Sequence, residues 1–283
     1  MDKAKAERAA KEQAQRWGLH EVTHFTETHR AHLFRASTDT GPVALKLYKH
    51  IGWSGEGAAI PFLKNLREGV GVRILRKDTL RAAMLLEWLE GPTLQAVANA
   101  GQSALADEKL AAVAHGVATS RFPLGFALPN VMRRMHRHLG ATLAAAKDEN
   151  TASILQRAFG VSSTLCRTAP KLGVIHGDLS LENVILTAKG PRLIDPKALR
   201  ADPAIEFAKT LSAPAGGMTA DALCDNITER SQRLCEAVDA SPDRLIKWAI
   251  VELAKGLPTA PPSSERDHNR IAQVDALLAL VDA

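Results

Sequence analysis

The sequence predicts an α+β fold with two lobes, a small mixed lobe with an antiparallel sheet and a larger, mainly helical lobe. Residues 20–89 consist mostly of short apolar runs with alternating polarity, which is typical of strands, and they contain one helical segment. Residues 93–170 and 202–282 show the spacing of amphipathic helices. Between these helical stretches, residues 172–196 combine short apolar runs with a polar loop and a hairpin.

We place the boundary between the lobes after residue 90, where an apolar run ends in a polar connector with Gly91. Residues 1–90 then form the N-terminal lobe, and residues 91–283 form the C-terminal lobe. Periodicity indicates the elements, while Pro and paired Gly mark the loops. We expect an exposed helix through Arg16, strands at 20–25, 32–37, 43–48 and 82–89, a short helix within 55–66, helices at 131–146 and 152–166, a hairpin of 184–187 with 192–195, loops at 213–217 and 258–264, and a last helix ending near Val281.

The most informative motif is the octet His176-Gly177-Asp178-Leu179-Ser180-Leu181-Glu182-Asn183, which Asp195 follows. The octet lies between two apolar runs, so it should form a tight loop between buried strands, and Gly177 permits a sharp turn beside Asp178. The hairpin that follows should carry Asp195 back toward Asn183. A carboxylate that accepts a hydroxyl proton, with an amide and a second carboxylate that hold magnesium, is the set that phosphoryl transfer from ATP requires. Asp and Asn beside a turn are usually turn formers, but the complete pattern favours the catalytic interpretation.

Phosphoryl transfer also needs an upstream lysine that holds the nucleotide phosphates. Lys46 is the candidate, because it lies in the alternating strand Val43–Tyr48 and should face the same side as Ala44. The nearby Lys49 should face the other way and is the less favoured alternative.

A partner carboxylate should fix this lysine. Glu56 is favoured over Glu68, because Glu56 opens the helical segment that follows the lysine strand, whereas Glu68 lies in a glycine-containing loop. Pro61 interrupts that segment, so the helix is expected to be short or to begin at Pro61 with Glu56 outside it. For either glutamate, an ordinary solvated position is the alternative.

Two further segments are candidates for contacts with the nucleotide. The turn Thr26–Ala31 precedes the lysine strand and has no Gly-x-Gly-x-x-Gly, but the hydroxyl of Thr28 and nearby backbone N–H groups are able to contact phosphate. An ordinary hairpin turn explains this segment about equally well. After the strand at 82–89, backbone groups from Glu87 to Leu89 are candidates for pairing with the edge of adenine.

On these residues the chain resembles the aminoglycoside phosphotransferase family, the small-molecule branch of the protein-kinase-like fold, from about residue 20 to its end. The specific part of the resemblance is His176–Leu186 with Leu193–Pro196. The tract Ile194–Ala208 is similar to the branch that contains streptomycin kinases and aminoglycoside/hydroxyurea resistance kinases. The resemblance implies a two-lobed protein-kinase-like fold with ATP in the cleft between the lobes.

The resemblance also implies a role for each matched residue. Asp178 would be the catalytic base, and Asn183 and Asp195 would be the magnesium ligands. Lys46 would bind phosphate with the support of Glu56.

Three positions depart from familiar patterns. Ser180 stands where the family usually has His, which changes a contact near the transferred phosphate, and Glu206 stands where many members have Asp. Pro196-Lys197 follows the metal-binding aspartate in place of the Phe-Gly of protein kinases, so the activation-loop switch of those enzymes is not expected.

Composition limits the classes of partner and the cellular compartment. The formal net charge is +5, but no block of like charges occurs and aromatic residues are only 4% of the chain, so we do not expect nucleic-acid binding. The three cysteines, Cys166, Cys224 and Cys235, fit neither a disulfide framework nor a zinc site. The N-terminus lacks the apolar core of a signal peptide, and no apolar run is long enough for a membrane span. We therefore expect a cytoplasmic protein; the sequence does not indicate its oligomeric state.

The phosphate acceptor is the least defined part of the prediction. A polycationic aminoglycoside such as streptomycin would attract carboxylates, and antibiotic resistance would then be the biological role. One helical region offers Asp221, Asp225, Glu229, Glu236 and Asp239, although an ordinary solvated face explains them better. A metabolic sugar or amino alcohol is the alternative acceptor, and a catalytically silent kinase-fold binding protein is the alternative function. Because the lysine, the loop carboxylate and both metal-binding residues are present, an ATP- and magnesium-dependent kinase for a small-molecule hydroxyl is favoured.

Overall fold

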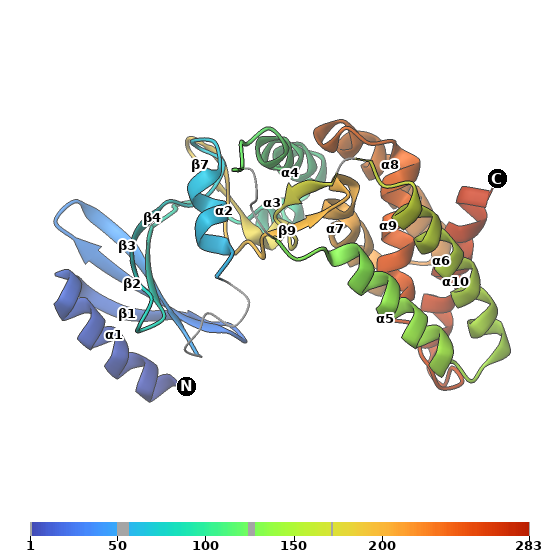
Figure 1. The fold of residues 1–283 in the computed structure, drawn as a ribbon, viewed down its shortest axis with the longest axis horizontal. Coiled ribbons are helices and arrows are strands. Elements are labelled where there is room, and N and C mark those ends of the chain that lie inside the picture. Colours follow the sequence, from blue (N-terminus) through green and yellow to red (C-terminus); the bar gives the residue numbers. More distant parts are fainter. Residues whose placement is uncertain (1, 50–56, 124–127, 171, 283) are drawn as a thin grey trace.

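The computed structural model describes residues 2–49, 57–123, 128–170 and 172–282, and Figure 1 shows an N-terminal part built on a sheet beside a larger helical part. The helices are α1 (Lys3–Trp17), α2 (Ala59–Asn65), α3 (Leu94–Asn99), α4 (Ser103–Ala118), α5 (Val131–Ala145), α6 (Glu149–Arg167), α7 (Ala208–Ser212), α8 (Ala220–Leu234), α9 (Pro242–Ala254) and α10 (Glu265–Asp282). The strands are β1 (His20–Glu27), β2 (Ala31–Thr38), β3 (Gly41–Tyr48), β4 (Ile74–Asp78), β5 (Ala83–Glu87), β6 (Gly173–Ile175), β7 (Val184–Thr187), β8 (Gly190–Leu193) and β9 (Leu199–Ala201). The predicted α+β fold with two lobes and an antiparallel sheet is confirmed.

Strands β1 to β5 form one antiparallel sheet in the order β1-β2-β3-β5-β4. In β3 all residues of Val43–Tyr48 are buried, and the apolar ones alternate between two apolar clusters on opposite faces of the sheet. Leu45 packs on the α1 side, whereas Ala44 packs on the side that faces α2. The period of two therefore places Lys46 on the same face as Ala44, as the sequence predicted, and this face is the one toward α2.

Helix α1 is present but is not the exposed helix that the sequence suggested. Asp2 caps its first turn by accepting the Lys5 N–H at 2.8 Å. Ala6, Ala10 and Ala14 are buried at successive steps of four residues and pack against the sheet. The prediction of exposure was wrong because small side chains at this spacing form a narrow apolar face among the charged residues.

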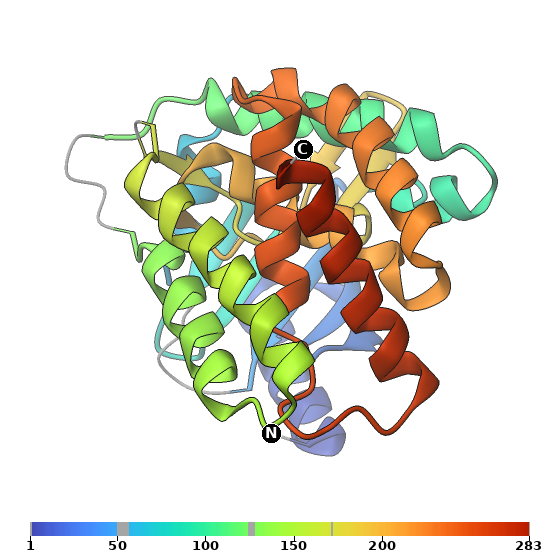
Figure 2. The same ribbon diagram turned by 90° about the vertical axis from the view of Figure 1, so that its right-hand side faces the viewer.

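Helix α9 lies at the centre of the C-terminal part, and its Trp248 is fully buried. Figure 2 shows α5, α6, α9 and α10 packed as neighbours at the end of the molecule remote from the sheet. The buried Asp202, just after β9, accepts hydrogen bonds from the Trp248 indole N–H and the Arg244 guanidinium, both at 2.7 Å. This carboxylate thus fixes α9 to the chain segment that leaves the site.

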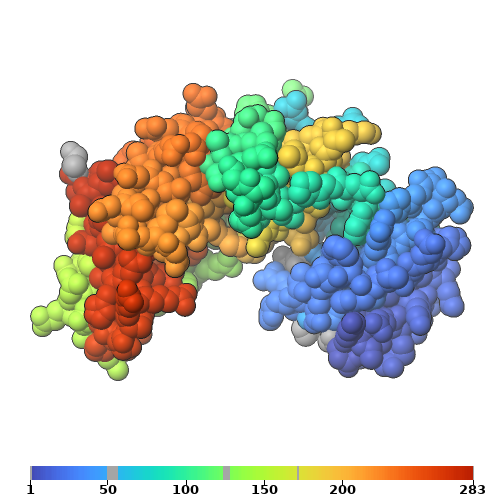
Figure 3. Space-filling model, turned by 180° about the vertical axis from the view of Figure 1, so that it is seen from behind, coloured from blue at the N-terminus to red at the C-terminus, as the bar shows by residue number. Residues whose placement is uncertain are grey.

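The hairpin β7–β8 joins the two parts of the molecule. The Leu193 N–H donates to the Val70 carbonyl, and the Val72 N–H donates to the Leu193 carbonyl, each at 2.9 Å. Arg192 on the same hairpin bonds the Gly71 carbonyl and the Glu87 carboxylate. Figure 3 shows a deep notch between the N-terminal part, in blue, and the C-terminal helices, in orange and red.

No helix in the described part of the chain has the length and apolar character needed to cross a membrane. The three cysteines are all free thiols.

Candidate active site

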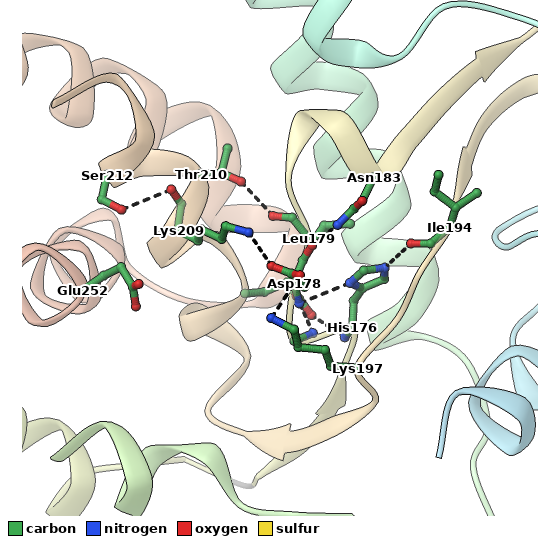
Figure 4. Close-up of polar contacts among 12 residues, drawn as sticks. His176, Asp178, Leu179, Asn183, Ile194, Lys197, Lys209, Thr210, Ser212 and Glu252 are labelled. Atoms are coloured by element: carbon green, nitrogen blue, oxygen red, sulfur yellow. Dashed lines mark hydrogen bonds and ion pairs between the residues drawn. The ribbon is translucent and has the colours of Figure 1, made fainter. Parts of the chain in front are cut away.

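The loop after β6 is fixed through the ring of His176, which is fully buried. Its Nε2–H donates to the Ile194 carbonyl at 2.8 Å, and its Nδ1 accepts the Asp178 N–H at 3.2 Å. Burial lowers the pKa of His176 to about 4, although the hydrogen bond to Ile194 acts in the opposite direction. The neutral imidazole therefore connects the loop to the segment after β8 (Figure 4).

The turn that leads into Asp178 depends on Gly177 and Glu206. Gly177 has φ +79°, and a Cβ on it would lie 2.6 Å from Cδ1 of Leu199. The Glu206 carboxylate accepts the backbone N–H groups of His176 at 2.7 Å and of Gly177 at 3.0 Å. Burial raises the pKa of Glu206 to about 7 despite these donors. Glu206 thus has a structural role, which the sequence left open.

Asp178 lies between two ammonium groups, those of Lys209 at 2.6 Å and Lys197 at 3.0 Å (Figure 4). Burial acts to raise the pKa of this carboxyl, but the two lysines together outweigh burial and hold the pKa below its usual value. The carboxylate is therefore ionised at neutral pH, as a proton acceptor must be. Neither lysine contact was predicted from the sequence. Lys197 directly follows Asp195-Pro196, which could have indicated that it lies near the site, whereas the sequence around Lys209 has no such motif.

Asn183 and Asp195 lie on either side of the β7–β8 hairpin. The Asn183 side-chain amide donates to the Asp178 carbonyl at 2.8 Å, and the Ile194 N–H donates to the Asn183 carbonyl at 2.9 Å. The second strand is shorter at its end than predicted, because β8 stops at Leu193. Asp195 instead occupies a left-handed turn with φ +54°. The hairpin nevertheless brings the Asp195 segment back to Asn183.

Lys46 and Asp195, 149 residues apart in sequence, form an ion pair with Nζ and Oδ1 2.9 Å apart. Lys46 is only 4% exposed, and its ammonium lies over the Tyr48 ring. A small apolar cavity adjoins this pair, with Met84 and Leu86 from β5 among its walls. Of the predicted partners for the lysine, Glu56 lies outside the described residues, and Glu68 is exposed in the turn after α2.

The other residues predicted to contact the nucleotide lie at the ends of strands β1 and β5 or just after them. Thr28 is exposed at the β1–β2 turn, where its hydroxyl accepts the Ala31 N–H at 3.0 Å. The Glu87 carboxylate forms ion pairs with Arg73, at 3.0 Å, and with Arg192. Its side chain therefore stabilises the connection between the lobes. Leu89 is half-buried against the apolar cluster on the α2 side of the sheet. Contacts of Thr28, Glu87 and Leu89 with a nucleotide stay predictions.

The two predicted metal ligands, Asn183 and Asp195, fit magnesium better than a metal whose ligands all come from protein side chains. Among the described residues, no group of three or more His, Cys, Asp or Glu side chains is placed to hold a metal ion. Magnesium usually takes one or two carboxylates together with substrate phosphates and water. The Asn183 amide carbonyl and the Asp195 carboxylate are oxygen donors of the kind that magnesium prefers.

A cavity of about 350 Å³ lies between Asp178 and the C-terminal helices. Its walls come from α5, the segment after Asp195, α7 and α9. The charged and imidazole side chains that line the cavity are Arg134, His138, Asp178, Lys197, Glu206, Lys209, Glu252 and Lys255. Glu252 on α9 lies across from Asp178 in Figure 4.

A two-lobed fold with a buried lysine on the sheet, an ionised loop carboxylate and an asparagine–aspartate pair defines a protein-kinase-like phosphotransferase. Residues 16–256 match the family described as aminoglycoside/hydroxyurea antibiotic resistance kinase, and the chain belongs to this family. The family resemblance in the sequence is thus confirmed, and the protein is a small-molecule kinase that acts on hydroxyl groups.

Solved structures share the fold at low sequence identity. A choline/ethanolamine kinase family protein from Mesorhizobium loti is 15% identical over 92% of each chain, with a TM-score of 0.64. Aminoglycoside phosphotransferase APH(4)-Ia is 12% identical over 98% of each chain, with a TM-score of 0.66. A thermostable mutant of APH(4)-Ia in a ternary complex with ADP and hygromycin B is 12% identical over 95% of this chain and 97% of that one, with a TM-score of 0.62. A search of curated protein sequences gave no match.

Proposed function

We propose that the protein transfers the γ-phosphate of ATP to an alcohol group of a small molecule in the presence of magnesium. The observation that carries this proposal is the ion pair of Lys46 with Asp195 beside the ionised Asp178. These residues come from both sides of the junction between the lobes, and each has a role in phosphoryl transfer. Residues 1–90 would be the nucleotide-binding lobe, and residues 91–283 would carry the catalytic loop and the acceptor site.

In this proposal Asp178 accepts the proton of the acceptor hydroxyl as the hydroxyl oxygen attacks the γ-phosphorus. Lys46 binds the nucleotide phosphates, and the backbone from Glu87 to Leu89 faces adenine. Asn183 and Asp195 would hold magnesium, which neutralises charge on the phosphates when bound. Thr28 and Glu56 would support the phosphates and Lys46, respectively.

Several acceptors are compatible with the family. Streptomycin or another aminoglycoside is one candidate, and resistance to it would then be the role in the cell. A metabolic sugar or an amino alcohol is another, since the similar structures include a choline/ethanolamine kinase family protein. The reaction would take place in the cytoplasm, where ATP and magnesium are available.

A coupled assay for ADP release tests this function. Purified protein with ATP and magnesium would be mixed with a panel of hydroxyl compounds, and the product would be identified by mass spectrometry. We expect ADP formation to require both an acceptor and magnesium, with one phosphate group added to the acceptor. Nucleotide binding without phosphate transfer to any acceptor would support the alternative of a catalytically silent kinase-fold binding protein.

A further inference from the structure

The cavity between Asp178 and the C-terminal helices has an unusual balance of charge for the site of a polycationic acceptor. Lys197 and Lys209 both approach the single carboxylate of Asp178, so one positive charge there is not neutralised by a second acid. Lys255 forms an ion pair with Glu252 at 2.7 Å. These contacts leave the floor of the cavity with more ammonium groups than accessible carboxylates.

Helix α5 adds further positive character to the wall opposite the catalytic loop. Arg134 and His138 are exposed and lie four residues apart, so they project from the same face of α5 into the cavity. Among the residues that the structure describes, Arg134 has no ion-pair partner. Its guanidinium is therefore available to a ligand.

The acidic side chains of the cavity do not offset this charge. Glu206 borders it, but its carboxylate is buried and bonded to the backbone N–H groups of His176 and Gly177. The carboxylates that the sequence suggested for a cationic acceptor belong to α8 and the turns after it, and they are not on the cavity walls: Asp221, Asp225, Glu229, Glu236 and Asp239. One of them, Glu229, is already paired with Arg233.

We propose that the phosphate acceptor is a hydroxyl compound that also carries an anionic group, a carboxylate or a phosphate, and that Arg134 binds this group. The proposal rests on the kinase function proposed above. A guanidinium forms strong, directional hydrogen bonds with either anion, and a cavity rich in one sign of charge concentrates ligands of the opposite sign. An aminoglycoside would place several ammonium groups beside Arg134 and three lysines, and the like charges would repel one another.

The reaction at this site is a simple phosphoryl transfer. The acceptor hydroxyl oxygen forms a bond to the γ-phosphorus, and the bond from that phosphorus to the β–γ bridging oxygen breaks. The bonding electron pair leaves with ADP, and the hydroxyl proton moves to the Asp178 carboxylate. Binding of the acceptor's anionic group by Arg134 would place its hydroxyl near that carboxylate.

Matched acceptors test the proposal directly. Rates of ADP release would be compared within two series: glycerol, glycerate and glycerol 3-phosphate, and glucose, gluconate and glucose 6-phosphate. Streptomycin and choline would represent cationic acceptors. We expect kcat/KM for at least one anionic member to exceed that of its neutral parent by about tenfold to about a hundredfold, the effect of one charge-assisted hydrogen bond. A preference for streptomycin, choline or the neutral parents would overturn the proposal.

Arg134 variants separate this inference from the kinase function. Arg134→Gln should raise KM for the anionic acceptor by about tenfold or more, whereas Arg134→Lys should recover part of the loss. Arg133→Gln is the control, because Arg133 is also exposed on α5 but does not line the cavity. Equal effects of Arg133→Gln and Arg134→Gln would count against Arg134 as the binding residue. If no acceptor supports ADP release, the proposed function fails as a whole; turnover restricted to neutral or cationic acceptors removes only the anionic-group inference.

Discussion

At the scale of single residues, the two lysines that contact Asp178 lower the pKa of the carboxyl that we propose as the base. Lys209 is the nearer of the two, with Nζ 2.6 Å from Oδ1. In Lys209→Met the carboxyl loses one of the charges that hold its pKa down, so its pKa should rise. We expect the acidic limb of the pH–rate profile for kcat/KM to move to higher pH. Lys189→Met, in the exposed turn between β7 and β8, is the control and should leave the profile in place.

His176 should make folding stability sensitive to acid. Its pKa is about 4 in the folded protein and about 6.5 in the unfolded chain, so the unfolded chain binds a proton first as pH falls. The free energy of unfolding should therefore decrease between about pH 6.5 and pH 4 by up to about 3 kcal/mol from this residue alone. Glu206 acts with the opposite sign between about pH 4.5 and pH 7, because its pKa is raised in the folded protein.

Urea unfolding of the wild type and His176→Gln at several pH values separates the contribution of His176 to the free energy of unfolding from that of Glu206. The difference between the two proteins should shrink as pH falls through this window, since only the wild type loses the contribution of the neutral imidazole. A pH-independent difference would show that His176 does not resist protonation.

The residues that we propose to take part in the reaction lie in more distinctive sequence motifs than the residues that support them. Asp178 and Lys46 lie in short motifs whose chemistry is specific. Lys209 and Arg134 lie on helices, where an exposed basic residue has no distinctive local pattern. The roles that we propose for them depend on long-range packing that brings α5 and α7 to the loop after β6.

At the scale of elements, Asp202 connects the short strand β9 to helix α9. Its side chain is 1% exposed and accepts hydrogen bonds from Arg244 and Trp248. Asp202→Ala should reduce the free energy of unfolding by about 3 kcal/mol or more, because the mostly buried Arg244 loses its carboxylate partner. Asp243→Ala on the same helix removes an exposed pair with Lys247 and should cost at most about 1 kcal/mol. If chemical denaturation gave the same loss of unfolding free energy for both variants, the proposed role of Asp202 in joining β9 to α9 would be wrong.

Elements with a clear apolar pattern were predicted, including the short hairpin of β7 and β8, whereas strand β9 was not. Helices α5 and α6 and strands β1 to β3 agree with the predicted segments to within a few residues. The pairing of β6 with β9 was not predicted, because three-residue strands carry no periodic signal and their partners are distant in sequence. The end of β8 was misplaced by two residues, since the apolar Ile194 continues the pattern beyond the last ladder pair.

At the scale of the whole molecule, the Lys46–Asp195 ion pair connects the sheet to the segment after the β7–β8 hairpin. Lys46→Met keeps the aliphatic length of the side chain but removes the charge that would meet the nucleotide phosphates. We expect kcat/KM for ATP to fall by about a hundredfold or more, the scale of losing one preorganised electrostatic contact. Lys49→Met is the control, because Lys49 pairs with Glu27 at the edge of the sheet. A loss of activity that only parallels a loss of folded protein in thermal unfolding would assign Lys46 a structural role instead.

The central claim is that Asp178 is the base of a phosphoryl-transfer site, and steady-state ADP formation by Asp178→Asn tests it most directly. The substitution keeps the size of the side chain but removes its ability to accept the hydroxyl proton. With ATP, magnesium and a working acceptor, kcat should fall by about 10²- to 10⁴-fold, while far-ultraviolet circular dichroism stays that of the wild type. Full turnover by a folded Asp178→Asn protein would contradict the account.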